Sequence, residues 1–217
     1  AVYITDPYEG KPAQKAGLRA GDKFIRIDKK SCLGKTTDEV SSALKGPKGT
    51  KVEVEVEREG KPLVFTISRE EIQLPDVPFS GMISKNIGYI SLSSFTQTAG
   101  ESVRKSLLDL KNQGMEKLIL DLRGNGGGLL MEAVKIVGFF VSKGQSVVTT
   151  KSRNEKENMT YKTLENPIAP DMPLMVLIDE NSASASEIFA GAIQDLDRAV
   201  VVGTTSFGKG LVQRTFD

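Results

Sequence analysis

Residues 177–213 read LIDENSASASEIFAGAIQDLDRAVVVGTTSFGKGLVQ, and this stretch decides the fold of the second half of the chain. An apolar run ends at Ile178, a turn of small residues follows, and a helical pattern over Ser184–Leu196 leads to a second apolar run at Val200–Val202. A strand, a helix and a strand in this order predict two parallel strands joined by a crossover helix. The turn then lies at the carboxyl end of a parallel strand, where α/β proteins place their ligands.

The chain upstream alternates in the same way. We expect strands at Ile87–Ser93, Lys117–Leu122, Ser146–Lys151 and Leu174–Ile178, and helices at Thr98–Gln113 and Leu129–Val141. The inner face of the first helix is assigned to Val103, Leu107, Leu108 and Leu110. Residues 211–216 are also β-like in composition. The pattern predicts one α/β domain with a parallel sheet over residues 87–217.

The first seventy residues have a different pattern, that of a small strand-rich module. Strands are expected at Val2–Thr5, Lys23–Asp28, Lys51–Arg58 and Leu63–Ser68, a helical turn at Pro12–Ala16, and a helix over Asp38–Leu44 capped by Thr36 or Thr37. Residues 71–86 contain Pro75 and Pro78 and are interpreted as a connector. The predicted domains are therefore 1–70 and 87–217.

Composition excludes several classes of function. The 217 residues carry a net charge of +1 and no tryptophan, so neither an electrostatic surface nor a base-stacking platform for nucleic acid is indicated. No apolar run is long enough to span a bilayer. Cys32 is the single cysteine, which excludes an intrachain disulfide and a thiolate metal cluster, and we expect it to be a small core or surface residue. The chain has no histidine.

Two glycine-rich segments resemble nucleotide-binding loops but fail in detail. In residues 121–128, DLRGNGGG, the third glycine of a dinucleotide-binding loop is replaced by Leu129, and no acidic residue ends the next strand. In residues 203–210, GTTSFGKG, Gly210 stands where a phosphate-binding loop needs serine or threonine. What remains of the first loop is backbone that can approach a ligand closely and present N–H groups to an anion.

The serine turn has a structural and a chemical interpretation. Ser182, Ser184 and Ser186 can cap the helix that follows, and on this stretch alone capping is the stronger interpretation. A catalytic serine needs a base, and without histidine a neutral lysine can serve, because burial favours the uncharged amine. Lys209 is the best candidate, since its neighbours, Phe207 among them, are apolar residues and glycines.

The first module resembles a PDZ domain of the bacterial protease type, on the run Ala16–Asp22 and the later Gly46–Thr50. The resemblance implies a groove that binds an extended peptide end as an added strand. The family's first strand and its carboxylate-binding loop precede this pattern, so the residues of that loop are not assigned. A purely structural module is the alternative.

Three further segments look like the signatures of carboxyl-terminal processing peptidases, which are tail-specific serine proteases that combine a PDZ domain with a crotonase-like α/β core. They are residues 121–128, residues 182–187 (SASASE) and residues 207–213 (FGKGLVQ), in the family's order. The resemblance implies the nucleophile Ser184, the general base Lys209, the lysine-orienting Gln213, and an oxyanion hole from Ala185 with Gly126 or Gly127. By comparison with the family's pattern, we expect both ends to be truncated.

The resemblance implies a serine endopeptidase with a Ser-Lys dyad that needs no metal or cofactor. Its partners would be protein or peptide substrates with an accessible C-terminus, in the periplasm or at the cell envelope, and homo-oligomerisation is left open. One alternative is a non-catalytic PDZ peptide-binding protein with an inactive crotonase-like core. Another is an acyl-CoA enzyme, because the core fold is shared with that chemistry.

Overall fold

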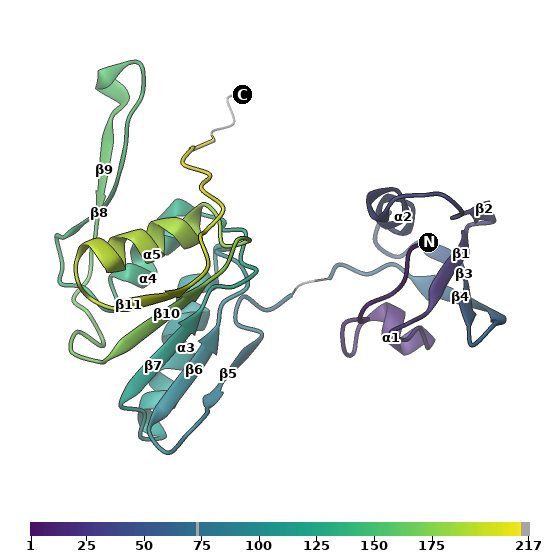
Figure 1. Ribbon diagram of the computed structural model, residues 1–217, viewed down its shortest axis with the longest axis horizontal. Helices are drawn as coiled ribbons and strands as arrows, with labels where there is room; N and C mark the ends of the chain where they lie inside the picture. Colours follow the sequence, from purple (N-terminus) through teal and green to yellow (C-terminus); the bar gives the residue numbers. More distant parts are fainter. Residues whose placement is uncertain (73, 214–217) are drawn as a thin grey trace. The chain divides into compact units, whose positions relative to one another are not determined.

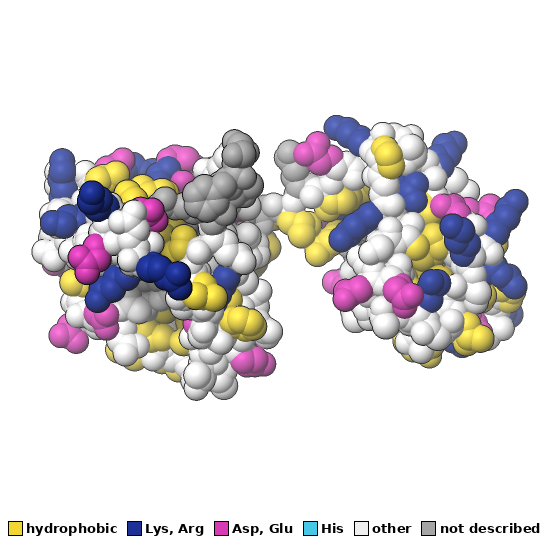
Figure 2. All heavy atoms as spheres, turned by 90° about the horizontal axis from the view of Figure 1, so that it is seen from above, with side chains coloured by type: hydrophobic (Ala, Val, Ile, Leu, Met, Phe, Trp, Pro, Cys, Tyr) yellow, Lys and Arg dark blue, Asp and Glu magenta, His cyan; other side chains and the backbone are white. Residues whose placement is uncertain are grey.

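The computed structural model describes residues 1–72 and 74–213. The chain forms two compact units, Ala1–Gln73 and Leu74–Asp217 (Figure 1). Each unit has its own hydrophobic core of buried residues. No helix in the described ranges is both long enough and apolar enough to cross a membrane. On the face seen in Figure 2, basic and acidic side chains are interspersed.

The first unit is a four-stranded antiparallel sheet in the order β2-β1-β3-β4, with two helices. Its elements are α1 (Pro12–Ala16), β1 (Lys23–Ile27), β2 (Lys30–Ser31), α2 (Thr37–Leu44), β3 (Lys51–Arg58) and β4 (Lys61–Ser68). The valines of β3 at positions 52, 54 and 56 are buried, and the residues between them face outward, as the alternating sequence predicts. Gly17 ends α1 with φ of 101°, in the left-handed region.

Two details of this unit go beyond the sequence prediction. The expected strand Val2–Thr5 is reduced to a single bridge between Tyr3 and Lys23, and Ile4 forms backbone hydrogen bonds with Gly21 and Asp22. Of the two possible caps for α2, the structure selects Thr36. Its Oγ1 accepts from the Glu39 N–H at 3.3 Å, and its own N–H donates to Glu39 Oε2 at 2.8 Å.

A buried ion pair joins the turn before β1 to the end of β3. Asp22 is fully buried, and Arg58 donates to its two carboxylate oxygens from Nε at 2.7 Å and Nη2 at 2.8 Å. Arg58 also donates to Gly17 O at 2.7 Å, and its guanidinium lies over the Phe65 ring. The Arg58 hydrogen bond holds the pKa of Asp22 below its usual range despite burial, which acts in the opposite direction.

The second unit is a five-stranded sheet in the order β11-β10-β7-β6-β5. Strands β6, β7, β10 and β11 are parallel, as predicted, and β5 is antiparallel to β6. The elements that build the unit are β5 (Phe79–Met82), β6 (Ile87–Ser91), α3 (Ala99–Asn112), β7 (Lys117–Asp121), α4 (Leu130–Val137), β8 (Ser146–Thr150), η1 (Glu155–Glu157), β9 (Met159–Lys162), β10 (Leu174–Ile178), α5 (Ala185–Asp195) and β11 (Val200–Gly203).

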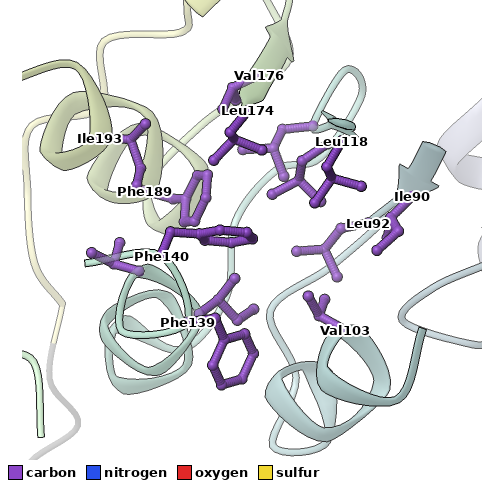
Figure 3. Packing of buried hydrophobic residues seen from close by; sticks show 14 of the residues in the cluster. Ile90, Leu92, Val103, Leu118, Phe139, Phe140, Leu174, Val176, Phe189 and Ile193 are labelled. Atoms are coloured by element: carbon purple, nitrogen blue, oxygen red, sulfur yellow. The ribbon is translucent and has the colours of Figure 1, made fainter. Parts of the chain in front are cut away.

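The core of this unit lies between one face of the sheet and the helices. The rings of Phe189 of α5 and Phe140 pack edge to face, with 6.3 Å between their centroids. They pack with sheet residues such as Leu118 and Val176 (Figure 3). On α3, Val103, Leu107 and Leu110 are buried, but Leu108 is 41% exposed. The prediction for Leu108 is therefore wrong, because one residue beyond Leu107 is a rotation of about 100° around the helix.

Two strands differ from the sequence prediction. β5 lies inside the segment expected to be a connector, and it pairs residue by residue with β6. β8 was expected among the parallel strands, but it pairs antiparallel with β9 in a separate two-stranded sheet. Residues 211–213 form no strand, and the rest of the β-like stretch 211–216 lies outside the described residues.

The Asp22–Arg58 pair predicts a pH-dependent stability of the first unit. A carboxylate whose pKa is lowered by folding contributes stability above its unfolded pKa of about 3.9, and this contribution is lost as the pH falls through the folded value. We expect Asp22→Asn to lower the free energy of unfolding at pH 7 by about 3 kcal/mol, because it leaves Arg58 unpaired. Urea denaturation measures the free energy of unfolding, and hydrogen exchange of the β3 amides shows that the change lies in the first unit.

The matched control is Lys23→Ala, which breaks the exposed Lys23–Glu57 pair at 3.5 Å. Its expected effect is below about 0.5 kcal/mol. Equal effects of the two variants would contradict the assignment. So would a loss of stability between pH 5 and pH 3 that is as large in Asp22→Asn as in the wild type.

Candidate active site

The site is built where β7 and β10 end side by side. In the parallel ladder Asp121 lies opposite Leu177, and the next N–H, of Leu122, donates to Leu177 O at 2.9 Å. The glycine loop 124–128 leaves β7 at this edge, and the serine turn 181–186 leaves β10 at the same edge. Parallel pairing thus brings together two segments more than fifty residues apart in the sequence.

Hydrogen bonds lock the serine turn onto the glycine loop. Ser182 Oγ donates to Leu122 O at 2.8 Å, and Ser186 Oγ donates to Asn125 O at 2.8 Å. The Ala183 N–H donates to the same Asn125 oxygen at 3.1 Å. Ser182 and Ser186 are both fully buried, so their hydroxyls have a structural task. Ser184 is the one serine of the three that solvent partly reaches.

Ser184 sits in a constrained backbone conformation at the start of α5. Its φ of 58° and ψ of −112° put a non-glycine residue in a rarely populated region, a form of strain that is typical of functional turns. Its N–H donates to Glu187 Oε2 at 2.8 Å. The N–H of Ala185, the first residue of α5, has no acceptor within the described chain. A donor at the positive end of a helix suits a developing oxyanion.

The loop approaches the serine so closely that one position must be glycine. A Cβ on Gly127 would lie 2.5 Å from Ala183 O, 2.7 Å from Ser184 Cβ and 2.9 Å from Ala185 N, and its φ is +99°. The neighbouring Gly126 has open space around it and an ordinary φ. Gly127 is therefore required for the contact between the two segments.

The two glycines named for the oxyanion hole are not equivalent. The Gly127 N–H donates to Asn125 Oδ1 at 2.8 Å, while the Gly126 N–H has no partner among residues 1–72 and 74–213. The Asn125 side chain is fully buried and also donates to Leu92 O at 2.8 Å. In this structure Gly126 offers its N–H freely, and Gly127 can do so only by giving up its bond to Asn125.

The segment that carries Lys209 returns to the serine turn after β11. The Phe207 N–H donates to Ser182 O at 3.0 Å, and the N–H groups of Gly208 and Lys209 donate to the Glu187 carboxylate at 2.6 Å and 3.1 Å. The structure thus places Lys209 in the segment bound to the turn that holds Ser184. Desolvation raises the pKa of Glu187, but the hydrogen bonds that it accepts outweigh this and hold the pKa below its usual range.

The lysine side chain itself is less enclosed than its sequence neighbours suggest. Lys209 is half-buried, but Phe207 and Leu211, expected to surround it, are 66% and 73% exposed. Within the described ranges no hydrogen bond joins the Lys209 side chain to Ser184. Gln213 is exposed and has no hydrogen bond to Lys209 in the same part of the chain. The structure assembles the serine turn and the glycine loop tightly, and it attaches the lysine segment through backbone contacts.

Sequence reasoning missed three acidic residues around the site. Asp179 accepts from the Gly124 N–H at 2.9 Å, Glu187 holds the lysine segment, and Asp121 binds Tyr89 and Arg123. Burial raises the pKa of Asp121, but its hydrogen bonds to Arg123 and Tyr89 prevail and lower it. A glutamate three residues after a serine at a helix start is a capping-box pattern, which could have singled out Glu187.

The comparisons with known proteins cover the segments that form this site. The family model of peptidase family S41 matches residues 86–217, which contain the glycine loop, the serine turn and the lysine segment. The chain belongs to peptidase family S41. A PDZ domain model matches residues 3–58, within the first unit. The fold is thus a PDZ domain followed by an α/β domain of this peptidase family, as the sequence predicted.

The sequence similarity to known proteins covers nearly the whole chain. The CtpA-like serine protease of Staphylococcus aureus (strain N315) is 36% identical over 214 residues, which are 99% of this chain and 43% of the relative. The solved photosystem II D1 C-terminal processing protease matches 99% of this chain and 59% of its own, with a TM-score of 0.64 and 30% identity. An S41 protease of Bacteroides fragilis, at 20% identity, shares the fold with a TM-score of 0.66 over 99% of this chain and 61% of its own. The chain spans less than half the length of the staphylococcal relative.

The close approach at Gly127 predicts a sharp difference between adjacent glycines. We expect Gly127→Ala to lower the free energy of unfolding by about 2 kcal/mol or more, because its Cβ meets backbone atoms at a positive φ. Gly126→Ala keeps its N–H and meets nothing within 4 Å, so its expected effect is within about 0.5 kcal/mol. Urea denaturation measures both, and equal effects of the two substitutions would show that the loop does not pack on Ser184 as described.

Proposed function

We propose that this S41 family member is a serine endopeptidase in which Ser184 is the nucleophile and Lys209 the general base. The observation that carries the proposal is the meeting of three segments at one turn. Ser184 stands at the start of α5 beside the unpaired Ala185 N–H, Gly127 packs on it, and the Lys209 backbone is bound through Glu187 to the Ser184 N–H. Nucleophile, oxyanion donor and base are the groups that acyl transfer requires.

In the proposed mechanism Lys209 Nζ removes the proton of Ser184 Oγ as this oxygen attacks the scissile carbonyl. The resulting oxyanion accepts hydrogen bonds from the Ala185 N–H and from an N–H of the glycine loop, at Gly126 or Gly127. Collapse of the tetrahedral intermediate expels the amine, which takes the proton from Lys209, and leaves an acyl-enzyme. A water molecule then gives a proton to Lys209 and attacks the acyl carbon, the bond from that carbon to Ser184 Oγ breaks, and Lys209 returns the proton to Oγ as the product acid leaves.

Gln213 is proposed to orient the Lys209 amine by a hydrogen bond. Because Gln213 is exposed and has no hydrogen bond to Lys209 among the described residues, this role requires the segment that carries both residues to rearrange. Lys209 can accept a proton only when its amine is uncharged. Because no hydrogen bond joins the Lys209 side chain to Ser184 in the described residues, the proposed dyad also requires this side chain to approach Ser184.

The PDZ unit supports recognition of a polypeptide end. Beside α2 it has an apolar hollow of about 420 Å³, whose lining includes Ile4, Leu18, Phe24, Leu44 and Ile67. An extended chain that brings an apolar terminal side chain would bury it there. We propose protein or peptide substrates recognised by an accessible C-terminus, and a site of action in the periplasm or at the cell envelope. Homo-oligomerisation is compatible with this function.

One observation favours a second candidate function. Because no hydrogen bond joins the Lys209 side chain to Ser184 in the described residues, the core could be inactive and the PDZ unit could act alone as a peptide-binding module. The two candidates differ in whether peptide bonds are cleaved.

Loss of either dyad member is expected to abolish cleavage. We predict that Ser184→Ala and Lys209→Ala each lower kcat/KM on fluorescein-labelled casein by about 1000-fold or more, with the circular dichroism spectrum unchanged. The control Lys143→Ala, at an exposed position, should retain wild-type activity. Full activity of Lys209→Ala would rule out its role as the base, and an inactive wild type would favour the binding module.

A blocked tail is expected to protect a substrate. We predict that one protein with a free apolar C-terminus is cleaved at least about 10-fold faster than the same protein with an amidated C-terminus, because the PDZ groove binds an extended chain end. Initial cleavage rates at equal concentrations measure this. Equal rates would remove tail recognition from the proposal and leave the peptidase activity intact.

A further inference from the structure

We propose that Glu187 is a positioning residue that holds the lysine segment against the serine turn. This inference rests on the proposed function, because it concerns how Lys209 reaches Ser184. Glu187 lies in the first turn of α5, three residues after Ser184. Its carboxylate contacts both the segment that carries the nucleophile and the segment that carries the base.

Four donors converge on this one carboxylate. Oε2 accepts from the Ser184 N–H at 2.8 Å and from the Lys209 N–H at 3.1 Å. Oε1 accepts from Ser206 Oγ at 2.8 Å and from the Gly208 N–H at 2.6 Å. Because every one of these groups donates, an ionised carboxylate satisfies all four, and an amide of the same shape cannot.

The lysine segment depends on these hydrogen bonds because it buries little apolar surface. Phe207, Leu211 and Val212 are all more than half exposed. In the described chain, five hydrogen bonds attach residues 204–213 to the rest of the unit: three to Glu187, one from Phe207 to Ser182 and one from Thr204 to Glu180. Without Glu187 two would remain, one of them exposed.

A simpler role for Glu187 would be to cap α5. A glutamate at this position commonly accepts a hydrogen bond from the N–H of the N-cap residue, as Glu187 does from Ser184. Capping alone would not bring in Ser206, Gly208 and Lys209, which belong to another segment. The two roles differ in what a substitution does to that segment.

The test compares two glutamates that contact the same segment. Glu187→Gln keeps the side-chain shape but places an NH2 group against two of the four donors. Glu180→Gln alters the single exposed bond to Thr204 Oγ1 at 3.1 Å and is the matched control. The readouts are kcat and KM on fluorescein-labelled casein, and the hydrogen-exchange protection of the Gly208 and Lys209 amides relative to the amides of α5.

We expect Glu187→Gln to lower kcat about 100-fold with KM within about 3-fold, and to reduce protection of the two amides by a similar factor. Glu180→Gln should stay within about 3-fold of the wild type in every readout. Wild-type kcat, or wild-type protection at Gly208 and Lys209, in Glu187→Gln would overturn the inference. Loss of protection throughout α5 together with the segment would reduce Glu187 to a helix cap.

A second variant guards against a folding defect in the first. Ser206→Ala removes one donor and leaves α5 untouched, and we expect it to lower kcat and protection at Gly208 about 3- to 10-fold. No change in either would contradict the inference. Lys209→Ala in the same assay separates a failure of the proposed dyad from a failure of the proposed role of Glu187. If it cleaves casein at the wild-type rate, the proposed dyad fails, while amide exchange still decides whether Glu187 holds the segment.

Discussion

The parallel pairing of β7 with β10 is the constraint on which the rest of the site depends. Its register sets Asp121 beside Leu177, so the two strands end together and both outgoing loops begin at one edge of the sheet. The buried residues of the strands, such as Leu120 and Val176, are fixed by packing against the helices. Core packing therefore determines where the loops start, and hydrogen bonds between the loops determine how they meet.

The contact between the glycine loop and the serine turn is made mostly by backbone atoms. Gly127 has no side chain to keep the loop away from Ser184, and the hydroxyls of Ser182 and Ser186 donate to the carbonyls of Leu122, just after β7, and of Asn125 in the glycine loop. Rigid packing holds Ser184 in its unusual conformation and leaves the Ala185 N–H unpaired. The lysine segment is attached in another way, by hydrogen bonds to Glu187 on a surface with little apolar burial. The proposed nucleophile is thus held more firmly than the proposed base.

Sequence periodicity predicted the strands and helices that are buried on one side, and it predicted that β6, β7, β10 and β11 run parallel; the order of these strands in the sheet was not predicted. It failed at two antiparallel pairs of consecutive strands: β5 pairs with β6 although its sequence has a connector's composition, and β8 pairs with β9 outside the main sheet. At the site, the motifs predicted the segments that the fold brings together, and they named the middle serine as the proposed nucleophile. They could not show that Gly127 N–H is bonded to Asn125, because a side chain's choice of partner depends on the folded backbone. The exposure of Phe207 likewise follows from tertiary packing.

The central claim is that Ser184 becomes nucleophilic through Lys209. Mass-spectrometric mapping of the adduct formed by a fluorophosphonate tests it most directly, because this reagent reacts with activated serines irrespective of which substrate is natural. The account predicts one adduct per chain, on Ser184, formed in the wild type and absent when Lys209 is replaced by alanine. An adduct on Ser182 or Ser186, or labelling of Ser184 that is unchanged without Lys209, would contradict it.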